Sequence, residues 1–280
     1  MKILIVGNGY VGARCAQEWG EEVVHTDVRI TSEKDMVRLL EEHEPEVVLN
    51  AAGTTGKPNV DWCETHQMQT IMGNTHLPIV MAYACAERNV YLLHIGSGCI
   101  FYGNSPDPEG WREEDFGNPT AVYSRAKYAA DLVLSTLPNV GIARIRMPLD
   151  DRPSPRNIVD KLLSYPKIID VKNSLTVIPE MVRVFRALLE QKAEGIFHVT
   201  NPGVIGHREI LEMYAEIVGE VPKKEWITPE ELVQQGLAKK IRSTNRLQSR
   251  NLAKFGIEMT EAKEAVRMAL ENYRNVMKKS

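Results

Sequence analysis

The sequence predicts an α/β fold built on a doubly wound parallel sheet, and three observations lead to that prediction. Short apolar runs alternate with longer mixed stretches through the first half of the chain. The runs are nearly continuous in Val, Ile and Leu, as strands buried on both faces should be. A glycine-rich turn follows the first run directly. Strand–helix repetition at this spacing requires right-handed crossovers, so we expect a Rossmann-type sheet with a smaller C-terminal α/β lobe that binds substrate.

The predicted elements of the sheet follow one another along the first 147 residues. Strands are expected at residues 2–6, 23–28, 46–52, 91–97 and 141–147. Helices are expected at residues 10–19, 32–44, over a long stretch around 63–88, and at 121–137. Ser32 can cap the second helix because Asp35 follows three residues later, and Pro45 marks its exit.

The pattern loosens after Met147, where "LDDRPSPRN" (149–157) carries two prolines and is typical of a loop leaving the sheet. "GIFHVTNPG" (195–203) resembles another buried strand, and an amphipathic helix is expected over 207–220. We therefore predict a dinucleotide-binding domain from residues 1–147 plus 172–200. The substrate-binding lobe would combine 148–171 with 201–280.

Composition narrows the classes of function. The formal net charge of the 280 residues is −3, so no basic field indicates nucleic acid or an anionic membrane as a partner. No apolar run approaches the roughly 20 residues of a membrane span, and the N-terminus shows no signal-peptide pattern. The four cysteines are scattered and the seven histidines lack metal-ligand spacing. We expect a cytoplasmic protein without a metal, and the oligomeric state, a homodimer included, stays open.

The turn "VGNGYVG" indicates a dinucleotide site. Gly7, Gly9 and Gly12 have the GxGxxG spacing, which permits a tight turn, close backbone approach to a pyrophosphate, and close helix–strand packing. Asp27 ends the second predicted strand, 15 residues after Gly12, and a carboxylate there favours NADH by bonding the ribose. Arg29 favours NADPH because it can pair with a 2′-phosphate. The cofactor is therefore NADPH or NADH.

Three side chains form a reductase pattern. Ser97 ends a predicted strand, and Tyr123 and Lys127 lie four residues apart, which places them on one helix face. A nearby ammonium favours tyrosinate, and we expect it to bring the tyrosine pKa toward the working range. Tyr123 can then donate a proton to a carbonyl oxygen that Ser97 also binds. This is the catalytic pattern of the short-chain dehydrogenase/reductase family.

The chain resembles the extended short-chain dehydrogenases/reductases of the dTDP-4-dehydrorhamnose reductase type. Within that type it is most similar to the bifunctional 3,5-epimerase/4-reductases that make UDP-L-rhamnose. The matching stretches are "NAAGTTGKPNVDWCE" (50–64), "GCIF" (98–101), "YSRAK" (123–127), "RIRMP" (144–148), "PRN" (155–157), "NPG" (201–203) and "EILEMY" (209–214). The chain departs from the plant pattern in its GNGYVG fingerprint, in Ser97 for threonine, and in Asp27.

The resemblance implies a second chemistry and further site residues. It implies that Cys99 and Lys167 exchange protons at C3 and C5 of a 4-keto sugar, whereas Lys172 is a competitor for the lysine role and Cys99 can also be a buried packing residue. For the cofactor it implies Asn8, Tyr10, Val11, Ala51, Ala52, Gly53 and Asn74, besides the three glycines, Tyr123 and Lys127. For the substrate it implies Trp62, Gly98 and Asn157, besides Ser97 and Cys99. We take Arg144 and Arg146 as structural.

The expected activity is conversion of UDP- or dTDP-4-keto-6-deoxyglucose to the L-rhamnose nucleotide with NAD(P)H. Two other interpretations stay open. In the first, the chain is a simple dTDP-4-dehydrorhamnose 4-reductase in which Cys99 is a bystander. In the second, it is a non-catalytic dinucleotide-binding regulatory subunit. A binder would need the glycine turn but not the proton donor Tyr123.

Overall fold

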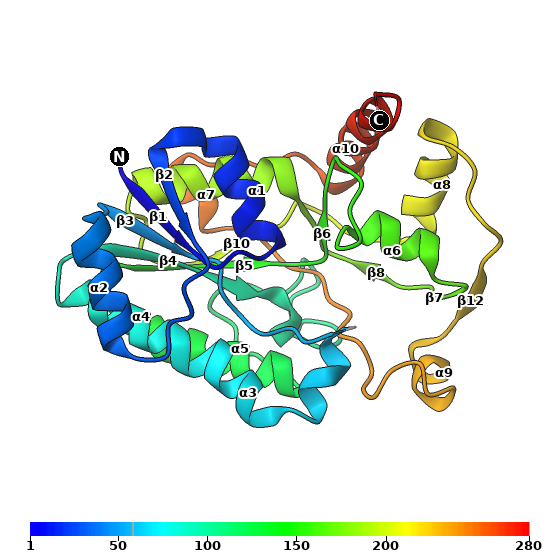
Figure 1. The fold of residues 1–280 in the computed structure, drawn as a ribbon. Coiled ribbons are helices and arrows are strands. Elements are labelled where there is room, and N and C mark those ends of the chain that lie inside the picture. Colours follow the sequence, from blue (N-terminus) through cyan, green and yellow to red (C-terminus); the bar gives the residue numbers. More distant parts are fainter. Residues whose placement is uncertain (58, 280) are drawn as a thin grey trace.

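A six-stranded parallel sheet forms the centre of the computed structural model, which describes residues 1–57 and 59–279 (Figure 1). The strand order is β2-β1-β3-β4-β5-β10, and every neighbouring pair is parallel. The strands are β1 (Ile3–Val6), β2 (Val23–Thr26), β3 (Val47–Asn50), β4 (Tyr91–Ser97), β5 (Val140–Ile145) and β10 (Gly195–His198). All six predicted strands are present, and the predicted doubly wound parallel sheet is confirmed.

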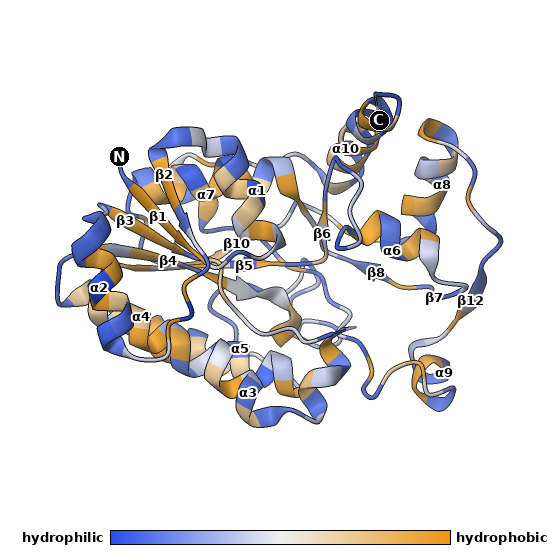
Figure 2. Ribbon diagram, in the orientation of Figure 1, coloured by the Kyte–Doolittle hydropathy of each residue, from blue (hydrophilic) through white to orange (hydrophobic). Residues whose placement is uncertain are grey.

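Helices cover both faces of this sheet. α1 (Tyr10–Trp19) and α7 (Ile178–Glu190) pack on one face, and α2 (Glu33–His43), α4 (Leu77–Ala86) and α5 (Val122–Leu134) on the other (Figure 1). Side chains alternate between the faces as a strand requires: Ile3 and Ile5 join the α7 cluster, whereas Leu4 and Val6 join the α2–α4–α5 cluster. Because both faces are covered, β1 and β3 are wholly apolar apart from Asn50 and stand out in Figure 2.

The expected long helical stretch around residues 63–88 is present as an uninterrupted run over residues 67–86. It consists of α3 (Gln67–Ile71), a π-helical turn η3 (Met72–His76) and α4, and a 3₁₀ turn η2 (Val60–Glu64) precedes it. Pro78 lies in the first turn of α4, directly after the π-helical turn, in which Leu77 N donates to Met72 O, five residues earlier. At Gly73 a Cβ would lie 2.1 Å from Thr54 Oγ1, so the chain also approaches its neighbour too closely for an ordinary helix residue.

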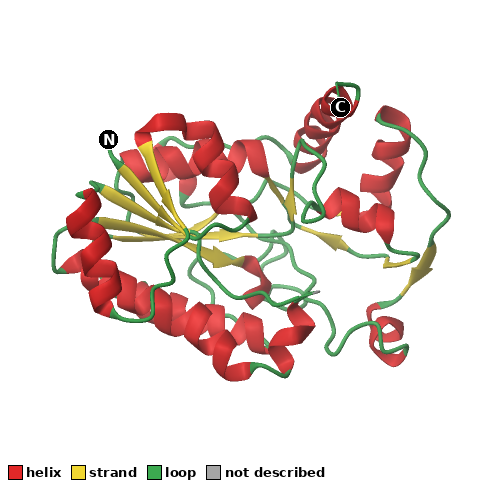
Figure 3. Cartoon of the chain, in the orientation of Figure 1, coloured by secondary structure: helices red, strands yellow, loops and turns green. Residues whose placement is uncertain are grey.

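A second set of elements lies to one side of the main sheet (Figure 3). Its strands form three short pairs: β6 (Pro148–Leu149) with β9 (Thr176–Val177), β7 (Lys167–Ile169) with β12 (Glu225–Ile227), and β8 (Lys172–Asn173) with β11 (Ile205–Gly206). Its helices are α6 (Ile158–Ser164), α8 (His207–Ile217), α9 (Pro229–Gln234) and α10 (Ala262–Met277). These elements share a core that includes Leu149, Ile168 and Leu270. The exact division of the chain into two lobes stays a prediction.

Two short helical turns complete the chain. η4 (Gly98–Ile100) directly follows β4, and η5 (Leu252–Phe255) returns from the second set of elements to the main sheet, where Leu252 packs in the same cluster as Ile3. Among the residues that the structure describes, no helix combines the length and apolar character needed to cross a bilayer.

Candidate active site

The glycine turn after β1 leaves open space only at its middle position. A Cβ on Gly7, where φ is +110°, would lie 2.5 Å from the backbone nitrogen of Ala52. A Cβ on Gly12 would lie 2.3 Å from Gly7 O, whereas one on Gly9 would meet nothing nearer than Ala51 O at 4.0 Å. The backbone at Gly9 is therefore exposed at the N-terminus of α1, where helix N–H groups favour an anion. This cradle fits the pyrophosphate of a dinucleotide.

The cradle lies where ligands bind in such sheets. The strand order reverses at β1, with β2 on one side and β3 on the other, and the carboxyl ends of strands at this point form a binding crevice. Asn8 and Gly53 are exposed there, and Val11, Ala51 and Ala52 are partly buried. The Tyr10 hydroxyl is already engaged within the protein, because it donates to Asp150 Oδ2 over 2.8 Å.

The two residues that bear on cofactor choice are both available. Asp27 and Arg29 follow β2 and are exposed, and neither side chain has a hydrogen-bond or ion-pair partner in the described part of the chain. Both side chains are therefore available for interactions with a cofactor.

Ser97, Tyr123 and Lys127 come together at the end of β4. Ser97 is the last residue of β4, and Tyr123 and Lys127 lie in the first two turns of α5. Lys127 is 5% exposed and donates from Nζ to Ile95 O over 2.8 Å, which fixes it beside the strand that carries Ser97. Hydrogen bonding to Ser97 is among the influences that lower the Tyr123 pKa. The arrangement is that of a proton donor beside an oxygen-binding hydroxyl.

The pKa of Tyr123 differs from the expectation. Burial and the nearby Cys99 raise it well above its usual value, and hydrogen bonding to Ser97 only partly offsets this. Burial also lowers the pKa of Lys127 to about 8, against the opposing effect of Asp131. Desolvation, and not the lysine charge that the YxxxK spacing suggested, is therefore the main influence on the tyrosine pKa. Tyr123 is held as a neutral phenol, which is the form that can donate a proton.

Glu64 and Asn74 support the positions of Tyr123 and Lys127 through hydrogen bonds to the backbone. Glu64, from the conspicuous "VDWCE" stretch, accepts from Val122 N over 2.8 Å and so caps α5 one residue before Tyr123. Asn74 is fully buried in η3, donates to Thr54 O over 2.8 Å, and accepts from Thr54 N. It thereby fixes the turn next to Gly53, where a Cβ would lie 3.7 Å from Lys127 Nζ.

Cys99 belongs to the same group. Its backbone N–H donates to Ser97 Oγ over 3.2 Å, so the turn η4 folds the thiol back toward the serine. Arg146 donates from Nη1 to the Cys99 sulfur over 3.0 Å. Burial raises the pKa of this thiol, but the Arg146 charge and hydrogen bonds from Ser97, Ser243 and Arg146 outweigh it, and the net effect is a lowered pKa. Cys99 therefore has the environment of a reactive thiol.

Arg146 is the functional candidate that sequence reasoning missed. The sequence indicates a structural role for it because it flanks a predicted buried strand, and "RIRMP" contributes only to the family resemblance. The contact to Cys99 joins residues 47 positions apart. Only the parallel pairing of β4 with β5, which sets Ser97 opposite Ile145, places the two side chains on the same edge of the sheet.

The remaining predicted residues are placed differently. Lys167 begins β7, where Nζ bonds Gln235 Oε1 over 2.9 Å and pairs with Glu225 at 3.2 Å, and no contact in the described chain joins it to Cys99. The side chain of Asn157 caps α6 and bonds the backbone of the turn at 150–152, so all its polar atoms serve that turn. Trp62 stacks on His66 at 3.9 Å between ring centroids. Gly98 packs closely against Leu247.

A buried ion pair lies behind Lys127. Asp131, one helical turn further along α5, accepts from Arg144 Nε over 2.7 Å, and the two side chains are 0% and 2% exposed. Arg144 also donates from Nη1 to Glu113 O over 3.2 Å, and the same nitrogen lies 3.3 Å from His198 Nε2. His198 Nδ1 lies 2.8 Å from Gln248 O, so the neutral ring carries its proton on Nδ1 and accepts from Arg144.

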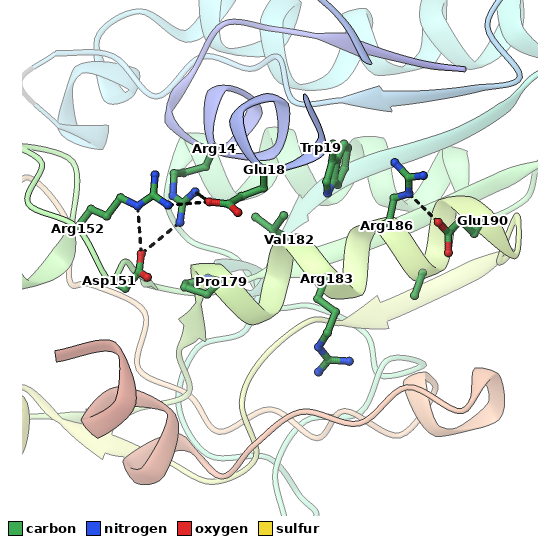
Figure 4. Close-up of a pocket in the computed structure, with 11 residues that line it drawn as sticks. Arg14, Glu18, Trp19, Asp151, Arg152, Pro179, Val182, Arg183, Arg186 and Glu190 are labelled. Carbon is green, nitrogen blue, oxygen red and sulfur yellow. Dashed lines mark hydrogen bonds and ion pairs between the residues drawn. The ribbon is translucent and has the colours of Figure 1, made fainter. Parts of the chain in front are cut away.

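A separate depression of about 490 Å³ lies between α1 and α7, on the face of the sheet rather than at its carboxyl edge (Figure 4). Most of its charged side chains are paired: Arg14 and Arg152 both pair with Glu18, at 2.5 and 2.7 Å, and Arg186 pairs with Glu190. Arg183 donates to the backbone oxygen of Glu258. None of the candidate catalytic residues lines it.

The fold and this site together define an extended short-chain dehydrogenase/reductase. A family model described as "RmlD substrate binding domain" matches residues 1–275, and the chain belongs to that family.

Three proteins illustrate what the chain is similar to. It is 35% identical over 266 residues to the bifunctional dTDP-4-dehydrorhamnose 3,5-epimerase/dTDP-4-dehydrorhamnose reductase of Arabidopsis thaliana, covering 92% of this chain and 87% of that protein. A trifunctional UDP-glucose 4,6-dehydratase/UDP-4-keto-6-deoxy-D-glucose 3,5-epimerase/UDP-4-keto-L-rhamnose-reductase of the same plant is 33% identical over 95% of this chain, which spans 41% of that protein. The crystal structure of the UDP-rhamnose synthase from Acanthamoeba polyphaga mimivirus superposes with a TM-score of 0.90 at 30% identity, covering 97% of this chain and 99% of that one.

Proposed function

We propose that the protein is a nucleotide-sugar 3,5-epimerase/4-keto reductase. It converts a UDP- or dTDP-linked 4-keto-6-deoxyglucose to the L-rhamnose nucleotide with NADH or NADPH. The observation that carries this proposal is the position of Cys99, a thiol with a lowered pKa in the turn that begins at the reductase serine. A thiol at that place is unnecessary for reduction alone. The relatives that unite both activities support the same conclusion.

The dinucleotide would be held at the crevice beside β1. Gly7, Asn8, Gly9 and Gly12 would bind its pyrophosphate, and Asp27 and Arg29 would meet the adenosine ribose. Residues 51–53, with Asn74 behind them, would lie along its path toward Lys127. When bound, NAD(P)H supplies the hydride for reduction.

In the reduction the chain's own residues supply the proton. Ser97 and Tyr123 bind the C4 ketone oxygen, and Tyr123 transfers its phenolic proton to that oxygen as C4 becomes tetrahedral. The resulting tyrosinate recovers a proton from solvent. Lys127, buried beside it with a pKa of about 8, stabilises the transient negative charge while it is protonated.

In the epimerisation the same two hydroxyls hold the enolate oxygen. A base removes the proton at C3 or C5, the C–H electron pair moves toward the ketone oxygen, and an acid returns a proton from the opposite face of the ring. We assign Cys99 to one face and Lys167 to the other. Lys167 is 35% exposed and bound to Gln235 and Glu225, so it must leave these partners to meet the sugar.

The partners of Lys167 favour one alternative, a 4-keto reductase without epimerase activity, which acts on a sugar epimerised elsewhere. A non-catalytic dinucleotide-binding subunit is a weaker alternative, because it would not need Tyr123 and Lys127 beside Ser97. The sugar pocket would include Trp62 and Gly98. Asn157 would have to release its bonds to the turn at 150–152 to contact the substrate. A cytoplasmic location and a homodimer stay predictions.

One experiment separates these functions. Purified protein is incubated with UDP- and dTDP-4-keto-6-deoxyglucose, each with NADH and NADPH separately, in deuterated water. We expect oxidation of the nicotinamide, deuterium at C3 and C5, and an L-rhamnose nucleotide as product. Nicotinamide oxidation without deuterium, or oxidation that begins only when a separate 3,5-epimerase is added, would indicate the simple reductase. No oxidation even with the added epimerase would indicate the non-catalytic subunit.

A further inference from the structure

Arg146 is a buried arginine whose charge has no carboxylate partner. The residue is 6% exposed, and none of the ion pairs among residues 1–57 and 59–279 includes it. The other two deeply buried arginines differ: Arg144 pairs with Asp131 at 2.7 Å, and Arg14 with Asp150 at 3.2 Å. A buried guanidinium that lacks an anion is costly, so a compensating negative charge should lie within its reach.

The Cys99 thiol is the acidic group that Arg146 touches. Nη1 donates to the Cys99 sulfur over 3.0 Å, and Nη2 donates to Asn173 Oδ1 over 2.7 Å and to Ser243 O. Asn173 and Ser243 are neutral acceptors and cannot compensate the charge. The guanidinium Nε is buried without a partner. The Arg146 guanidinium is therefore held through Nη2 by residues of β8 and of the 242–247 segment, and its Nη1 points at the Cys99 sulfur.

We propose that Arg146 is a positioning residue that holds Cys99 as a thiolate, ready to remove the proton on a carbon next to the C4 ketone. This inference rests on the proposed function for the carbon acid, but the ion pair itself requires no substrate. In the proton transfer the thiolate takes the proton and becomes a thiol, and the C–H electron pair forms the enolate that Ser97 and Tyr123 bind. The thiol then releases its proton to solvent, so no oxidant or reductant is consumed.

The other charged and titratable groups around the pair do not compete for this role. Tyr123 faces Cys99 and is a neutral phenol with a raised pKa. His207 is close enough to Arg146 to feel its charge, and its Nδ1 is 3.0 Å from Ile169 O. Burial, aided by the Arg146 charge, lowers the pKa of this imidazole. The Arg146 charge is also the principal influence that lowers the pKa of the Cys99 thiol against burial.

The backbone around the thiol is held from the same direction. Asn245 donates from Nδ2 to Gly98 O over 2.9 Å and to Phe101 O over 2.8 Å, bracketing the turn that carries Cys99. Asn173 Oδ1 accepts from both Arg146 and the backbone nitrogen of Asn245. The same set of hydrogen bonds therefore positions both the turn that carries Cys99 and the Arg146 guanidinium. A short contact between the two groups depends on such support.

The test measures the acidity of the thiol in the full chain without sugar. Iodoacetamide alkylation of Cys99 is followed between pH 5.5 and 9.5 by peptide mass spectrometry. An adjacent cation lowers a pKa by about 1–3 units, so we expect an apparent pKa at least about one unit below the usual 8.5, with a roughly tenfold slower reaction near pH 6.5 in Arg146→Met. Arg146→Lys should restore part of the difference, because the charge remains but the fork is lost.

The matched control is Arg242→Met. Arg242 lies in the same 242–247 segment but pairs with Asp61 at 2.6 Å instead of touching Cys99, so the alkylation profile should not change. Equal profiles for the wild type and Arg146→Met would overturn the proposal. If Arg146→Met fails to fold, the absorbance of the thiolate near 240 nm is titrated in the wild type and in Cys99→Ser. The difference between the two titrations gives the ionisation of Cys99. A difference titration centred at pH 8.5 or above overturns the proposal, and one near 7.5 or below supports it.

The outcome is independent of whether the protein is an epimerase. A low thiol pKa together with deuterium entry at C3 and C5, slower in Arg146→Met than in Arg242→Met, supports the whole proposal. A low thiol pKa in a wild-type protein that exchanges no deuterium leaves the ion pair standing and removes its assigned role in epimerisation. An ordinary thiol pKa with rapid exchange overturns the role of Arg146 and leaves the epimerase function intact.

Discussion

Removing the charge of Asp131 should move the pH dependence of the reduction. Asp131 lies one turn beyond Lys127 on α5, and its negative charge opposes the burial that lowers the Lys127 pKa to about 8. Side chains one turn apart are separated by roughly 6 Å, where two unit charges interact by about 3 kcal/mol at an effective dielectric constant near 20. Asp131→Asn should therefore lower the Lys127 pKa by one to two units. The alkaline decline of kcat should shift from near pH 8 to about pH 6–7.

The same substitution should also destabilise the protein. Asp131 is the carboxylate that pairs with buried Arg144 at 2.7 Å, and breaking such a pair from one side costs about 3–5 kcal/mol. Replacing both partners, as in Asp131→Asn with Arg144→Met, removes the uncompensated charge and should recover most of that loss. The double variant should keep the shifted pH profile, because Lys127 still lacks the nearby carboxylate. Stability and pH dependence are thereby separated in two variants.

Initial rates of 4-keto reduction between pH 5.5 and 9.5, with saturating cofactor and sugar, give the profile. Urea unfolding at pH 7.5 gives the free energy of unfolding for the wild type and both variants. If kcat of Asp131→Asn declines at the same alkaline pH as kcat of the wild type, Lys127 is not the group whose protonation the reaction requires. If the double variant is no more stable than the single one, the cost does not come from the buried Arg144 charge.

Three further substitutions test the site. Tyr123→Phe should reduce kcat for reduction by about 10²–10⁴-fold through loss of the proton donor while cofactor affinity is retained, and a variant with most of the wild-type kcat would exclude Tyr123 as the acid. Asp27→Ser should shift the ratio of kcat/KM values toward NADPH, and an unchanged ratio would mean that Asp27 does not meet the ribose. Lys167→Met should suppress solvent deuterium entry and yield unepimerised 6-deoxy sugars, and normal L-rhamnose formation would remove Lys167 from the mechanism.

The sheet could be predicted from the sequence because burial on both faces leaves a signal in consecutive residues. β1 and β3 are apolar at nearly every position, and a short turn with the GxGxxG spacing follows β1. The capping box at Ser32 and Asp35 is likewise local, and the structure has it. The π-helical turn within the predicted helical stretch around 63–88 contains Gly73, which Thr54 approaches from another part of the chain. No pattern within the helix itself records that contact.

The chemistry of the site could be predicted less completely, because pKa values depend on burial that spacing does not encode. The YxxxK pattern placed Tyr123 and Lys127 together, but desolvation raises one pKa and lowers the other. Asn157 shows the same limit, since its side chain caps α6 and holds the turn before it. Arg146 went unrecognised because its partners come from three distant segments, at Cys99, Asn173 and Ser243.

Ser97 is the residue at which the two proposed chemistries meet. Its hydroxyl accepts from the Cys99 backbone, and hydrogen bonding to Ser97 lowers the Tyr123 pKa. Epimerisation needs the C4 oxygen stabilised as an enolate, and reduction needs the same oxygen protonated. A sugar bound with its ketone oxygen at Ser97 can therefore undergo both reactions without being released. This requires that the sugar ring lie with Cys99 on one face and Lys167 on the other, next to C3 and C5. The order of the reactions then follows from the acidity of those carbons, because reduction removes the ketone and with it the possibility of further epimerisation.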